Sequence, residues 1–556
     1  MKQWPVCSGD GRVKVLSEQA AVGGELWPFE EAQRLLSRVA DYPLSRKVVF
    51  ESGFGPSGLP HLGTLGEVLR PSYVRQALKE LAPERAGELI VFIDDLDGLR
   101  KVPESLPTPD RIAPYLGRPV SRIPDPFGDC HPSFSEHMIG LLGQFLAPVA
   151  VDYRLMRSSE TYRSGGFDPA LRLIMRHHEE IIAIVVPTMR EGNRQQWSPF
   201  LPLCPQCGQI NSTVVTAYHP DRASVEFVCE RAFGGARGCG YSGEQSILGG
   251  QAKVQWKVDW ALRWFALGVD YELYGKDLID SARLSGQIVG LLGGQPPLGF
   301  AYEMFLDEQG HKVSKSVGRG VGVDRWQRYA PIEVLKYFLM LNPRRARKLF
   351  IQAIPQFVDD YLALLRAWSK ADRAQRIQSP LWFILDPEGQ DRFESELSFG
   401  LIMNLVSALG SDDQQLIRNY LNNYDPVWSK SEQPLVGQHD AITSAMLDRL
   451  VDCALNYYRD FVEPTKQRYL PSGDERAQLL ALLEFFQRQP EASAEEIEKF
   501  VYDLGRRSYD KPGKIFPLLY KTLLGQPQGP RLGVFIKLVT PARIAAMLQA
   551  ALAPSP

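Results

Sequence analysis

The sequence predicts an α/β domain with a doubly wound parallel sheet, followed by an all-α domain. Residues 47–52 and 88–93 have the apolar, β-branched composition of short buried strands. Between them lie a loop rich in Gly, Pro and Ser and a segment with apolar residues at helical spacing. Strand, loop, helix and strand in this order open a nucleotide-binding fold of the Rossmann type. After about residue 340 long amphipathic patterns dominate and strand patterns almost vanish, which predicts the helical domain.

The remaining elements follow from the same periodicities. We expect strands near 148–157, 270–274 and 300–306, and helices near 168–183, 255–267 and 279–292. A chain of 556 residues allows three or four domains. We predict an N-terminal segment with the first half of the nucleotide-binding domain, an insertion with a cysteine cluster, the second half of the nucleotide-binding domain, and the helical domain, over 1–160, 161–250, 251–340 and 341–556.

The composition narrows the class of protein. A formal net charge of −2 excludes nucleic-acid binding through one global basic field, so any such contact must use local patches. Residues 344–348 form one candidate patch, and Arg319, Arg325 and Arg328 another, although an isolated charge run is more often a solvated helix face. No stretch has the length of an apolar membrane span and the N-terminus lacks a signal core, so we expect a cytoplasmic protein. Seven cysteines in this length are not a secreted disulfide framework.

The first chemical feature is the loop over 53–64, between a predicted strand and a predicted helix. Free N–H groups and the dipole at a helix N-terminus favour phosphate, and glycines let the backbone approach a ligand closely. His61 can donate a hydrogen bond to an oxygen that gains charge during nucleotidyl transfer. For this segment alone, a structural turn with a capping histidine is the alternative. The candidate ATP-binding residues are Gly53, Pro56, Ser57, Gly58, His61, Gly63 and Thr64.

The second feature is a lysine-rich loop over 307–318. Lys312 and Lys315 can hold a leaving polyphosphate as point charges, and Ser314 and Ser316 can donate hydrogen bonds to it. Flanking glycines would let the loop move. Alone, such a segment is more often an exposed basic loop. Its place after the first loop, at the other end of one α/β unit, favours a shared nucleotide site.

Together the two loops resemble the HIGH and KMSKS signatures of class I aminoacyl-tRNA synthetases. Residues 61–64 and 312–316 fill these signatures, with Thr64 in place of a second histidine and Val313 in place of methionine. The similarity extends over about 45–350. Further segments are similar to the class I lysyl-tRNA synthetases in particular, namely 94–103, 123–128, 256–260, 275–277, 302–303 and 342–344.

The resemblance implies an enzyme that activates L-lysine with ATP, releases pyrophosphate and transfers lysine to the 3′ end of tRNA(Lys). It assigns His61, Lys312 and Lys315 to catalysis, and Gly275 and Asp277 to the adenosine of ATP. Mg²⁺ is expected with ATP. The helical domain is expected to bind the anticodon. The sequence does not give the oligomeric state, and a monomer is the default.

A pocket for lysine needs a carboxylate for the ammonium group and gains from an aromatic wall. Trp256, Asp259, Trp260, Tyr302 and Glu303 supply these residue types in the region of the resemblance, which gives most weight to Trp256, Tyr302 and Glu303. A tryptophan at helical spacing is more often a core residue. The resemblance leads us to expect a histidine at 278, where Leu278 stands, so that contact is not expected here.

Two clusters could bind Zn²⁺. Cys204 and Cys207 have the C-x-x-C-Gly spacing of a zinc knuckle, and Cys229 and Cys239 could complete a four-cysteine site, although nine residues separate them. His219 is a fallback ligand, and free reduced cysteines are the alternative. The second cluster consists of Asp125, Cys130, His131 and His137. Asp129 competes with Asp125 for the role of carboxylate ligand, and the alternative interpretation of the whole segment is a proline-stabilised turn.

Two other functions remain open at this point. A synthetase of the same subclass for glutamate or glutamine would need a cationic pocket, whereas Asp259 and Glu303 favour a cationic substrate. A non-catalytic tRNA-binding paralogue would be expected to lose His61 or Lys315, and the sequence retains both.

Overall fold

The computed structural model describes residues 26–553 except 104–105, 129, 195, 312–321, 390–392, 394, 425–438 and 466–468. Contacts divide the chain into two compact units, Met1–Val323 with Leu339–Leu349, and Asp324–Phe338 with Phe350–Pro556. The segment Asp324–Phe338, which we assigned to the nucleotide-binding part, therefore groups with the helical unit. The finer division of the first unit stays a prediction.

The first unit is built on a parallel sheet with the strand order β3-β2-β1-β9. Helix α2 (Leu62–Leu81) connects the two central strands, as predicted. Because helices cover both faces of a parallel sheet, its two central strands are largely buried and apolar, whereas the edge strand β3 is partly exposed. Glu51 is a charged exception in the middle of a central strand. The strands are β1 (Val48–Phe54), β2 (Gly87–Ile93), β3 (Arg154–Arg157) and β9 (Tyr271–Glu272).

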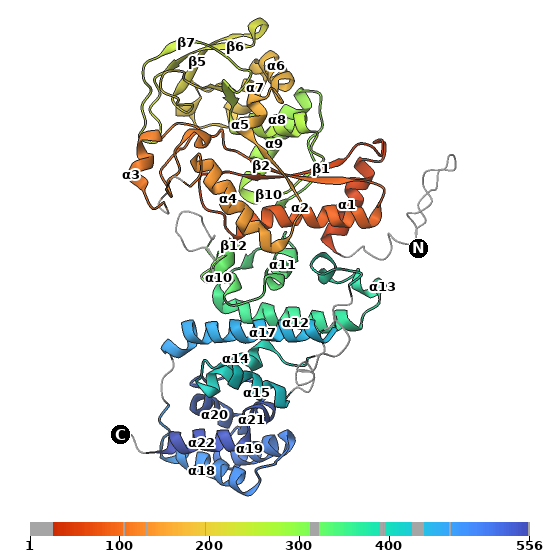
Figure 1. Cartoon of the computed structure of the whole chain (residues 1–556), viewed down its shortest axis with the longest axis vertical. Helices are drawn as coiled ribbons and strands as arrows, with labels where there is room; N and C mark the ends of the chain where they lie inside the picture. The colour runs from red at the N-terminus through yellow and green to blue at the C-terminus, as the bar shows by residue number, and fades with distance from the viewer. Residues whose placement is uncertain are drawn as a thin grey trace, which may run out of the picture. The chain divides into compact units, whose positions relative to one another are not determined.

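Helices α1 (Trp27–Arg38) and α2 lie on one face of the sheet, and α8 (Trp256–Leu267) and α9 (Ile279–Leu291) lie on the other (Figure 1). The helix expected over 168–183 is broken at His177 into two helices. The other helices of this unit are α3 (Pro109–Ile112), α4 (Phe134–Leu146), α5 (Ser158–Arg163), α6 (Asp168–Arg176) and α7 (His178–Val185).

Short strand pairs extend the core toward the lysine-rich loop. The strand expected over 300–306 is interrupted, because the backbone N–H of Glu303 donates to the carbonyl of Pro343 instead of continuing a ladder. Pairing of Gly275 with Tyr302 brings two predicted site segments together. The short strands are β10 (Tyr274–Gly275), β11 (Ala301–Tyr302), β12 (Phe305–Leu306) and β13 (Arg347–Lys348), paired in parallel as β10–β11 and β12–β13.

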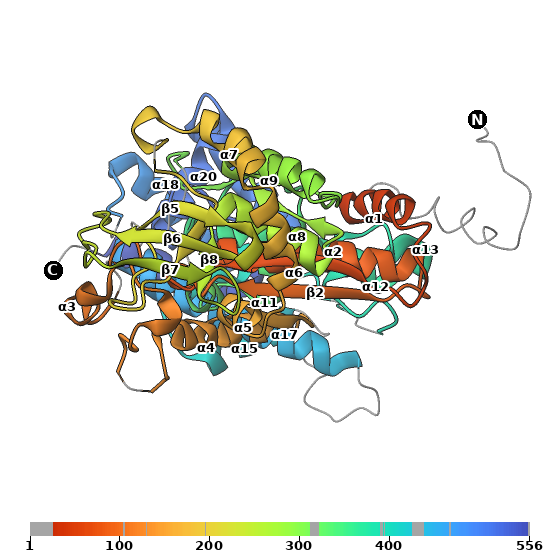
Figure 2. The ribbon, with the colours of Figure 1, turned by 90° about the horizontal axis from the view of Figure 1, so that it is seen from above.

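The cysteine-bearing insertion is a three-stranded antiparallel sheet, β5-β6-β7 (Figure 2). Its two ends meet in the antiparallel pair β4–β8, where Phe200 faces Val254. The insertion therefore leaves and rejoins the unit at one place. Its strands are β4 (Phe200–Pro202), β5 (Thr213–His219), β6 (Ser224–Cys229), β7 (Ser242–Ser246) and β8 (Ala252–Val254).

Helix α1 is fixed by a buried carboxylate. Glu31 accepts hydrogen bonds from Tyr271 at 3.0 Å, Arg344 at 2.7 Å and Arg34 at 2.8 Å. The Arg344 guanidinium also stacks on Phe300, 3.8 Å from the ring centre. Arg344, which belongs to a predicted basic patch, is thus committed to the fold of its own unit.

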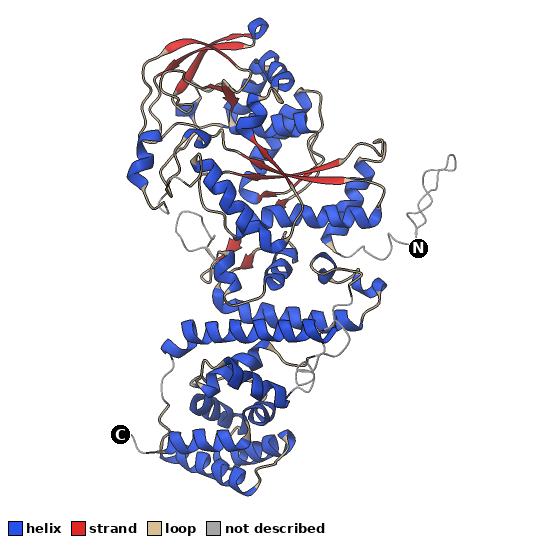
Figure 3. Cartoon of the chain, viewed as in Figure 1, coloured by secondary structure: helices blue, strands red, loops and turns tan. Residues whose placement is uncertain are grey.

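The second unit is helical throughout its described residues (Figure 3). Within it, Arg328 of the other predicted basic patch pairs with Asp460 at 2.6 Å. No single described helix is long and apolar enough to cross a membrane, and only the bent pair α21 and α22 passes that test together. The helices are α10 (Val323–Gln327), α11 (Ile332–Met340), α12 (Ile354–Lys370), α13 (Arg373–Arg376), α14 (Phe399–Leu409), α15 (Gln414–Tyr424), α17 (His439–Tyr457), α18 (Gly473–Arg488), α19 (Ala494–Ser508), α20 (Ile515–Leu524), α21 (Leu532–Val539) and α22 (Pro541–Leu552).

The packing of α21 on α19 predicts a sensitive glycine. A methyl group at Gly533 would lie 2.3 Å from the carbonyl oxygen of Ala494, so Gly533→Ala must push the helices apart. We expect a loss of about 1–3 kcal/mol in the free energy of unfolding, measured by thermal unfolding with circular dichroism. Gly473→Ala is the control, because nothing lies within 4 Å of its added methyl group. An equal effect of both variants would contradict the packing described.

Candidate active site and metal centres

His61 begins helix α2 and is held by a reciprocal pair of hydrogen bonds. The backbone N–H of Thr64 donates to His61 Nδ1 at 3.1 Å, and the His61 backbone N–H donates to Thr64 Oγ1 at 3.4 Å. Since Nδ1 accepts, a neutral His61 carries its proton on Nε2, which can donate to a phosphate oxygen. The Thr64 hydroxyl therefore orients the histidine, a role that the sequence left open.

Gly63 provides the space for the His61 ring. A methyl group at position 63 would lie 2.6 Å from Cε1 and 2.8 Å from Nδ1 of that ring. Gly53 is different, since a methyl group there would be no closer than 3.7 Å to its nearest neighbour. Of the loop side chains predicted to contact ATP, Pro56 is buried and Ser57 is exposed.

Gly275 and Asp277 lie at the carboxyl end of β10. A methyl group at Gly275 would lie 2.6 Å from Asp277 Oδ1 and 2.7 Å from Met304 Cε, so the glycine lets these side chains approach the strand. Asp277 itself is exposed. Because β1 and β9 pair in parallel, the segments that follow them leave the sheet at its carboxyl edge, where ligands of such sheets bind.

The lysine-rich loop lies partly outside the described residues. Lys312, Ser314, Lys315 and Ser316 all fall in the segment that the structure does not describe. The described flank is a tight turn in which the Asp307 N–H donates to the His311 carbonyl at 2.8 Å. The β12–β13 pair holds the segments before and after the loop together.

The five residues predicted to bind lysine fall into two groups. Tyr302 and Glu303 belong to β11 and its end. Tyr302 donates to Glu67 Oε1 at 3.0 Å, and the Arg70 guanidinium lies 4.4 Å from the centre of its ring. Glu303 forms an ion pair with Lys276, so it already has a cationic partner.

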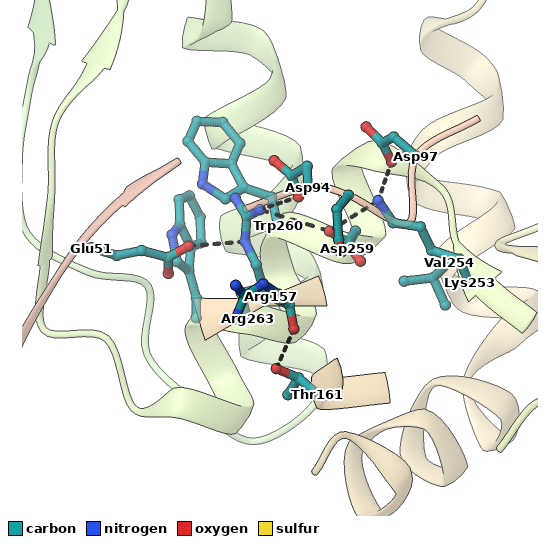
Figure 4. Close-up of polar contacts among 12 residues, drawn as sticks. Glu51, Asp94, Asp97, Arg157, Thr161, Lys253, Val254, Asp259, Trp260 and Arg263 are labelled. Atoms are coloured by element: carbon teal, nitrogen blue, oxygen red, sulfur yellow. Dashed lines mark hydrogen bonds and ion pairs between the residues drawn. The ribbon is translucent and has the colours of Figure 1, made fainter. Parts of the chain in front are cut away.

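The second group lies on α8 and includes Asp259, which is completely buried. Asp259 accepts a hydrogen bond from Tyr162 at 2.6 Å and forms ion pairs with Lys253 at 3.6 Å and Arg263 at 3.8 Å (Figure 4). The Asp259 carboxylate, which the sequence analysis proposed as the partner of the substrate ammonium, is therefore already paired with cations of the protein itself.

Trp256 and Trp260 stack with ring centres 5.2 Å apart. Trp260 is buried, and its indole N–H donates a hydrogen bond to Glu272 at 2.9 Å. The indole N–H of Trp264 also donates to Glu272. Trp260 thus has the environment of a core residue. Trp256 is partly exposed and remains available as an aromatic wall.

Arg263 is the centre of a charged network that the sequence did not reveal. Its Nη1 lies 2.7 Å from Asp94 and its Nε lies 2.9 Å from Glu51 (Figure 4). Lys253 bridges Asp97 and Asp259. The available signal is a charged residue inside an apolar strand, as at Glu51 in β1 and Lys253 in β8.

Burial dominates the electrostatics of this network. It raises the pKa of Asp94 to about 6, although Arg263 opposes the shift. Burial likewise raises the pKa of Glu51 and Glu272. The ionised forms of these carboxylates are therefore disfavoured when no further cation is nearby.

The structure brings the four predicted cysteines together. One sulfur atom from each of Cys204, Cys207, Cys229 and Cys239 lies within 4.8 Å of the others. A methyl group at Gly238 would lie 2.2 Å from the Cys229 carbonyl oxygen, so this glycine permits the turn that returns Cys239 to Cys229. The nine-residue separation is thus compatible with one tetrahedral site.

The chemistry of these thiols suits a metal ion. Burial raises the pKa of the Cys207 and Cys229 thiols, and a bound cation would reverse that shift by stabilising thiolates. Positive φ angles at Gly208 and Gly240 shape the turns behind the sulfur atoms. The fallback ligand His219 pairs with Glu226 at 2.9 Å instead.

The second predicted cluster also converges. Ligand atoms of Asp125, Cys130, His131 and His137 lie within 4.8 Å of one another. Asp125 points into the cluster, with its Oδ2 3.0 Å from His137 Nδ1. Asp129, the competing candidate, lies outside the described residues. Burial alone would raise the pKa of Asp125, but hydrogen bonds from Phe127 and His137 lower it. Carboxylate, thiol and two imidazoles are a zinc-binding set.

Comparison with known proteins identifies the family to which this chain belongs. The family model described as tRNA synthetases class I (K) matches residues 25–388. A lysine–tRNA ligase of Rickettsia bellii (strain OSU 85-389) is 37% identical over 522 residues, which cover 93% of this chain and 96% of that protein. A lysine–tRNA ligase of Rickettsia felis is also 37% identical, over 93% of this chain and 95% of its own length. The chain belongs to the class I lysyl-tRNA synthetases.

Solved structures of other aminoacyl-tRNA synthetases also align with this chain. A glutamate-tRNA synthetase from Elizabethkingia anophelis aligns with 91% of this chain and all of its own, at 12% identity and a TM-score of 0.40. A tyrosyl-tRNA synthetase from Archaeoglobus fulgidus covers 55% of this chain, at 15% identity and a TM-score of 0.29.

The two ligand clusters predict the zinc content of this synthetase. We expect one zinc ion in each cluster of the purified protein, measured by elemental analysis. Cys239→Ser and His137→Ala should each remove one ion, because each deletes one of four ligands. Cys453→Ser is the matched control, since Cys453 is a buried free cysteine outside both clusters. A wild-type protein purified without zinc would contradict both sites.

Proposed function

We infer that this chain is a lysine–tRNA ligase. It activates L-lysine with ATP to lysyl-adenylate, releases pyrophosphate and transfers lysine to the 3′ end of tRNA(Lys). The observation that carries this conclusion is 37% identity to curated lysine–tRNA ligases over 93% of the chain, together with the match to the lysine family of class I synthetases. Such enzymes use ATP and tRNA, and Mg²⁺ accompanies the nucleotide.

The loop after β1 is proposed to bind the ATP phosphates. In the first reaction the lysine carboxylate attacks the α-phosphorus, a new P–O bond forms, and the bond to pyrophosphate breaks. Negative charge grows on the phosphate oxygens, so a donor that is already oriented lowers the barrier. His61 fits this role because Thr64 fixes its ring and leaves the Nε2 proton as the donor.

The remaining site residues have complementary roles in this proposal. Lys312 and Lys315, with the serines at 314 and 316, hold the departing pyrophosphate. Gly275 and Asp277 meet the adenosine, where an exposed Asp277 carboxylate can accept hydrogen bonds from ribose hydroxyls. Trp256 is proposed as the aromatic wall for the lysine side chain, and Tyr302 in β11 as a second aromatic residue of the site.

The helical unit is proposed to bind the anticodon of tRNA(Lys), and both zinc ions are proposed to be structural. The four-cysteine site would hold the insertion sheet together. The Asp125 site would tie the start of α4 to the loop before it, through His137 and Asp125. We also propose that the enzyme works in the cytoplasm, where its tRNA is charged, and as a monomer.

The substrate assignment is tested by ATP–pyrophosphate exchange with each amino acid, in the presence and absence of tRNA(Lys). We expect exchange that depends on lysine and aminoacylation of tRNA(Lys). Glutamate- or glutamine-dependent exchange would instead identify a synthetase of the same subclass with another substrate. The absence of exchange with every amino acid, with tRNA present, would leave only a tRNA-binding protein.

The role of His61 is tested through its neighbour Gly63. Gly63→Ala places a methyl group against the His61 ring, and the resulting displacement should lower kcat for exchange by about 100-fold, since small misplacements of catalytic groups have effects of this size. Gly290→Ala is the control, because this helical glycine has open space around it. A Gly63→Ala enzyme with wild-type kcat would show that the ring position is unimportant.

A further inference from the structure

The buried network around Arg263 contains more carboxylates than cations. Glu51, Asp94, Asp259 and Glu272 are each no more than 6% exposed, and among the described residues of this network only Lys253 and Arg263 are buried cations. Lys253 is also shared with Asp97, whose side chain is 45% exposed. The buried groups thus comprise four potential negative charges and two positive charges. Burying unbalanced carboxylates is costly unless another cation joins them.

Glu51 is the carboxylate with the least support. Both of its oxygen atoms are buried and accept no hydrogen bond within the described residues, and its contact with Arg263 Nε lacks hydrogen-bond geometry. By contrast, Asp94 accepts from Arg263 Nη1 at 2.7 Å, and Asp259 accepts from Tyr162 at 2.6 Å. Glu272 accepts from the indoles of Trp260 and Trp264. Glu51 is therefore the member that a further cation would stabilise most.

The network lies directly beneath the start of the proposed ATP loop. A methyl group at Gly53 would lie 3.7 Å from Arg263 Nη2 and 3.9 Å from Asp94 Oδ2, and Glu51 precedes Gly53 by two residues in β1. Trp256, the partly exposed aromatic of α8, has its ring centre 5.8 Å from the Arg263 guanidinium carbon. The unbalanced charge therefore adjoins both the nucleotide loop and the proposed aromatic wall.

We propose that Glu51 is the specificity-determining residue for the amino acid, and that the carboxylate excess of its network selects a cationic side chain. This proposal rests on the lysine activation inferred above. Asp259 and Glu303, the carboxylates suggested by sequence, are already paired with internal cations. Glu51 is completely buried, so it acts through the electric field of the network, which a protein interior screens less than water.

The full-length Glu51→Gln variant tests the proposal with two amino acids of similar shape, lysine, whose side chain is charged, and norleucine, whose side chain is uncharged. The KM for lysine in ATP–pyrophosphate exchange and the inhibition constant of norleucine are measured with tRNA(Lys) present. We expect the lysine KM to rise by about 100-fold, as for the loss of one partner of a buried charge pair. The norleucine constant and the KM for ATP should stay within about threefold, because neither ligand has the side-chain ammonium group of lysine.

Equal changes for lysine and norleucine would reduce Glu51 to a structural role and overturn the proposal, as would an unchanged lysine KM. Glu31→Gln is the matched control, because Glu31 is equally buried in the same unit but outside the network. If Glu51→Gln fails to fold, Glu272→Gln takes its place. It should also raise the lysine KM relative to the norleucine inhibition constant, and it should fold because the new amide oxygen still accepts hydrogen bonds from the indoles of Trp260 and Trp264. A wild-type enzyme without lysine-dependent exchange would refute the proposed function instead.

Discussion

One buried guanidinium holds the centre of the first unit together. Arg263 reaches from helix α8 to Glu51 in β1 and to Asp94 directly after β2, so it joins two adjacent strands to the helix that covers them. Removing a single partner from such a set leaves an uncompensated buried charge, which costs more than the pair contributes. The positions of the proposed nucleotide loop after β1, of Trp256 and of the Asp259 carboxylate therefore all depend on Arg263.

Much of this architecture follows from periodicity and loop chemistry. The strands around Glu51 and Val91, the helix after His61 and the helical character beyond residue 350 were all predictable, because each is a local pattern. The residues proposed for the lysine side chain were less predictable. Arg263 lies one helical turn from Asp259 in α8, at a spacing that the sequence already shows, whereas Lys253 is recognisable as a partner of Asp259 only once strand β8 is placed beside helix α8. Trp260 was a candidate for the aromatic wall with a core residue as the more frequent alternative, and its buried hydrogen bond to Glu272 gives it the environment of a core residue.

The cysteine cluster shows the opposite case, in which an irregular spacing conceals a regular site. Cys229 ends strand β6 and Cys239 lies just before β7, and antiparallel pairing returns the chain to the same end of the sheet. The intervening loop length is then unimportant, because the register rather than the spacing sets the distance between the sulfur atoms. At the second cluster, the approach of Asp125 to the side chains of Cys130, His131 and His137 likewise depends on the folded loop, which the spacing alone does not give.

The anchoring of helix α1 has a consequence for synthesis on the ribosome. The hydrogen bonds of Glu31 to Tyr271 and Arg344 join residues 240 and 313 positions apart, and Trp27 bonds to Met340 over 313 positions. At roughly 5–20 residues per second, these partners emerge about 12–63 s after the helix itself. During that interval the carboxylate and the apolar face of α1 lack their final surroundings. The first unit can therefore close only after the insertion and the lysine-rich loop have been translated.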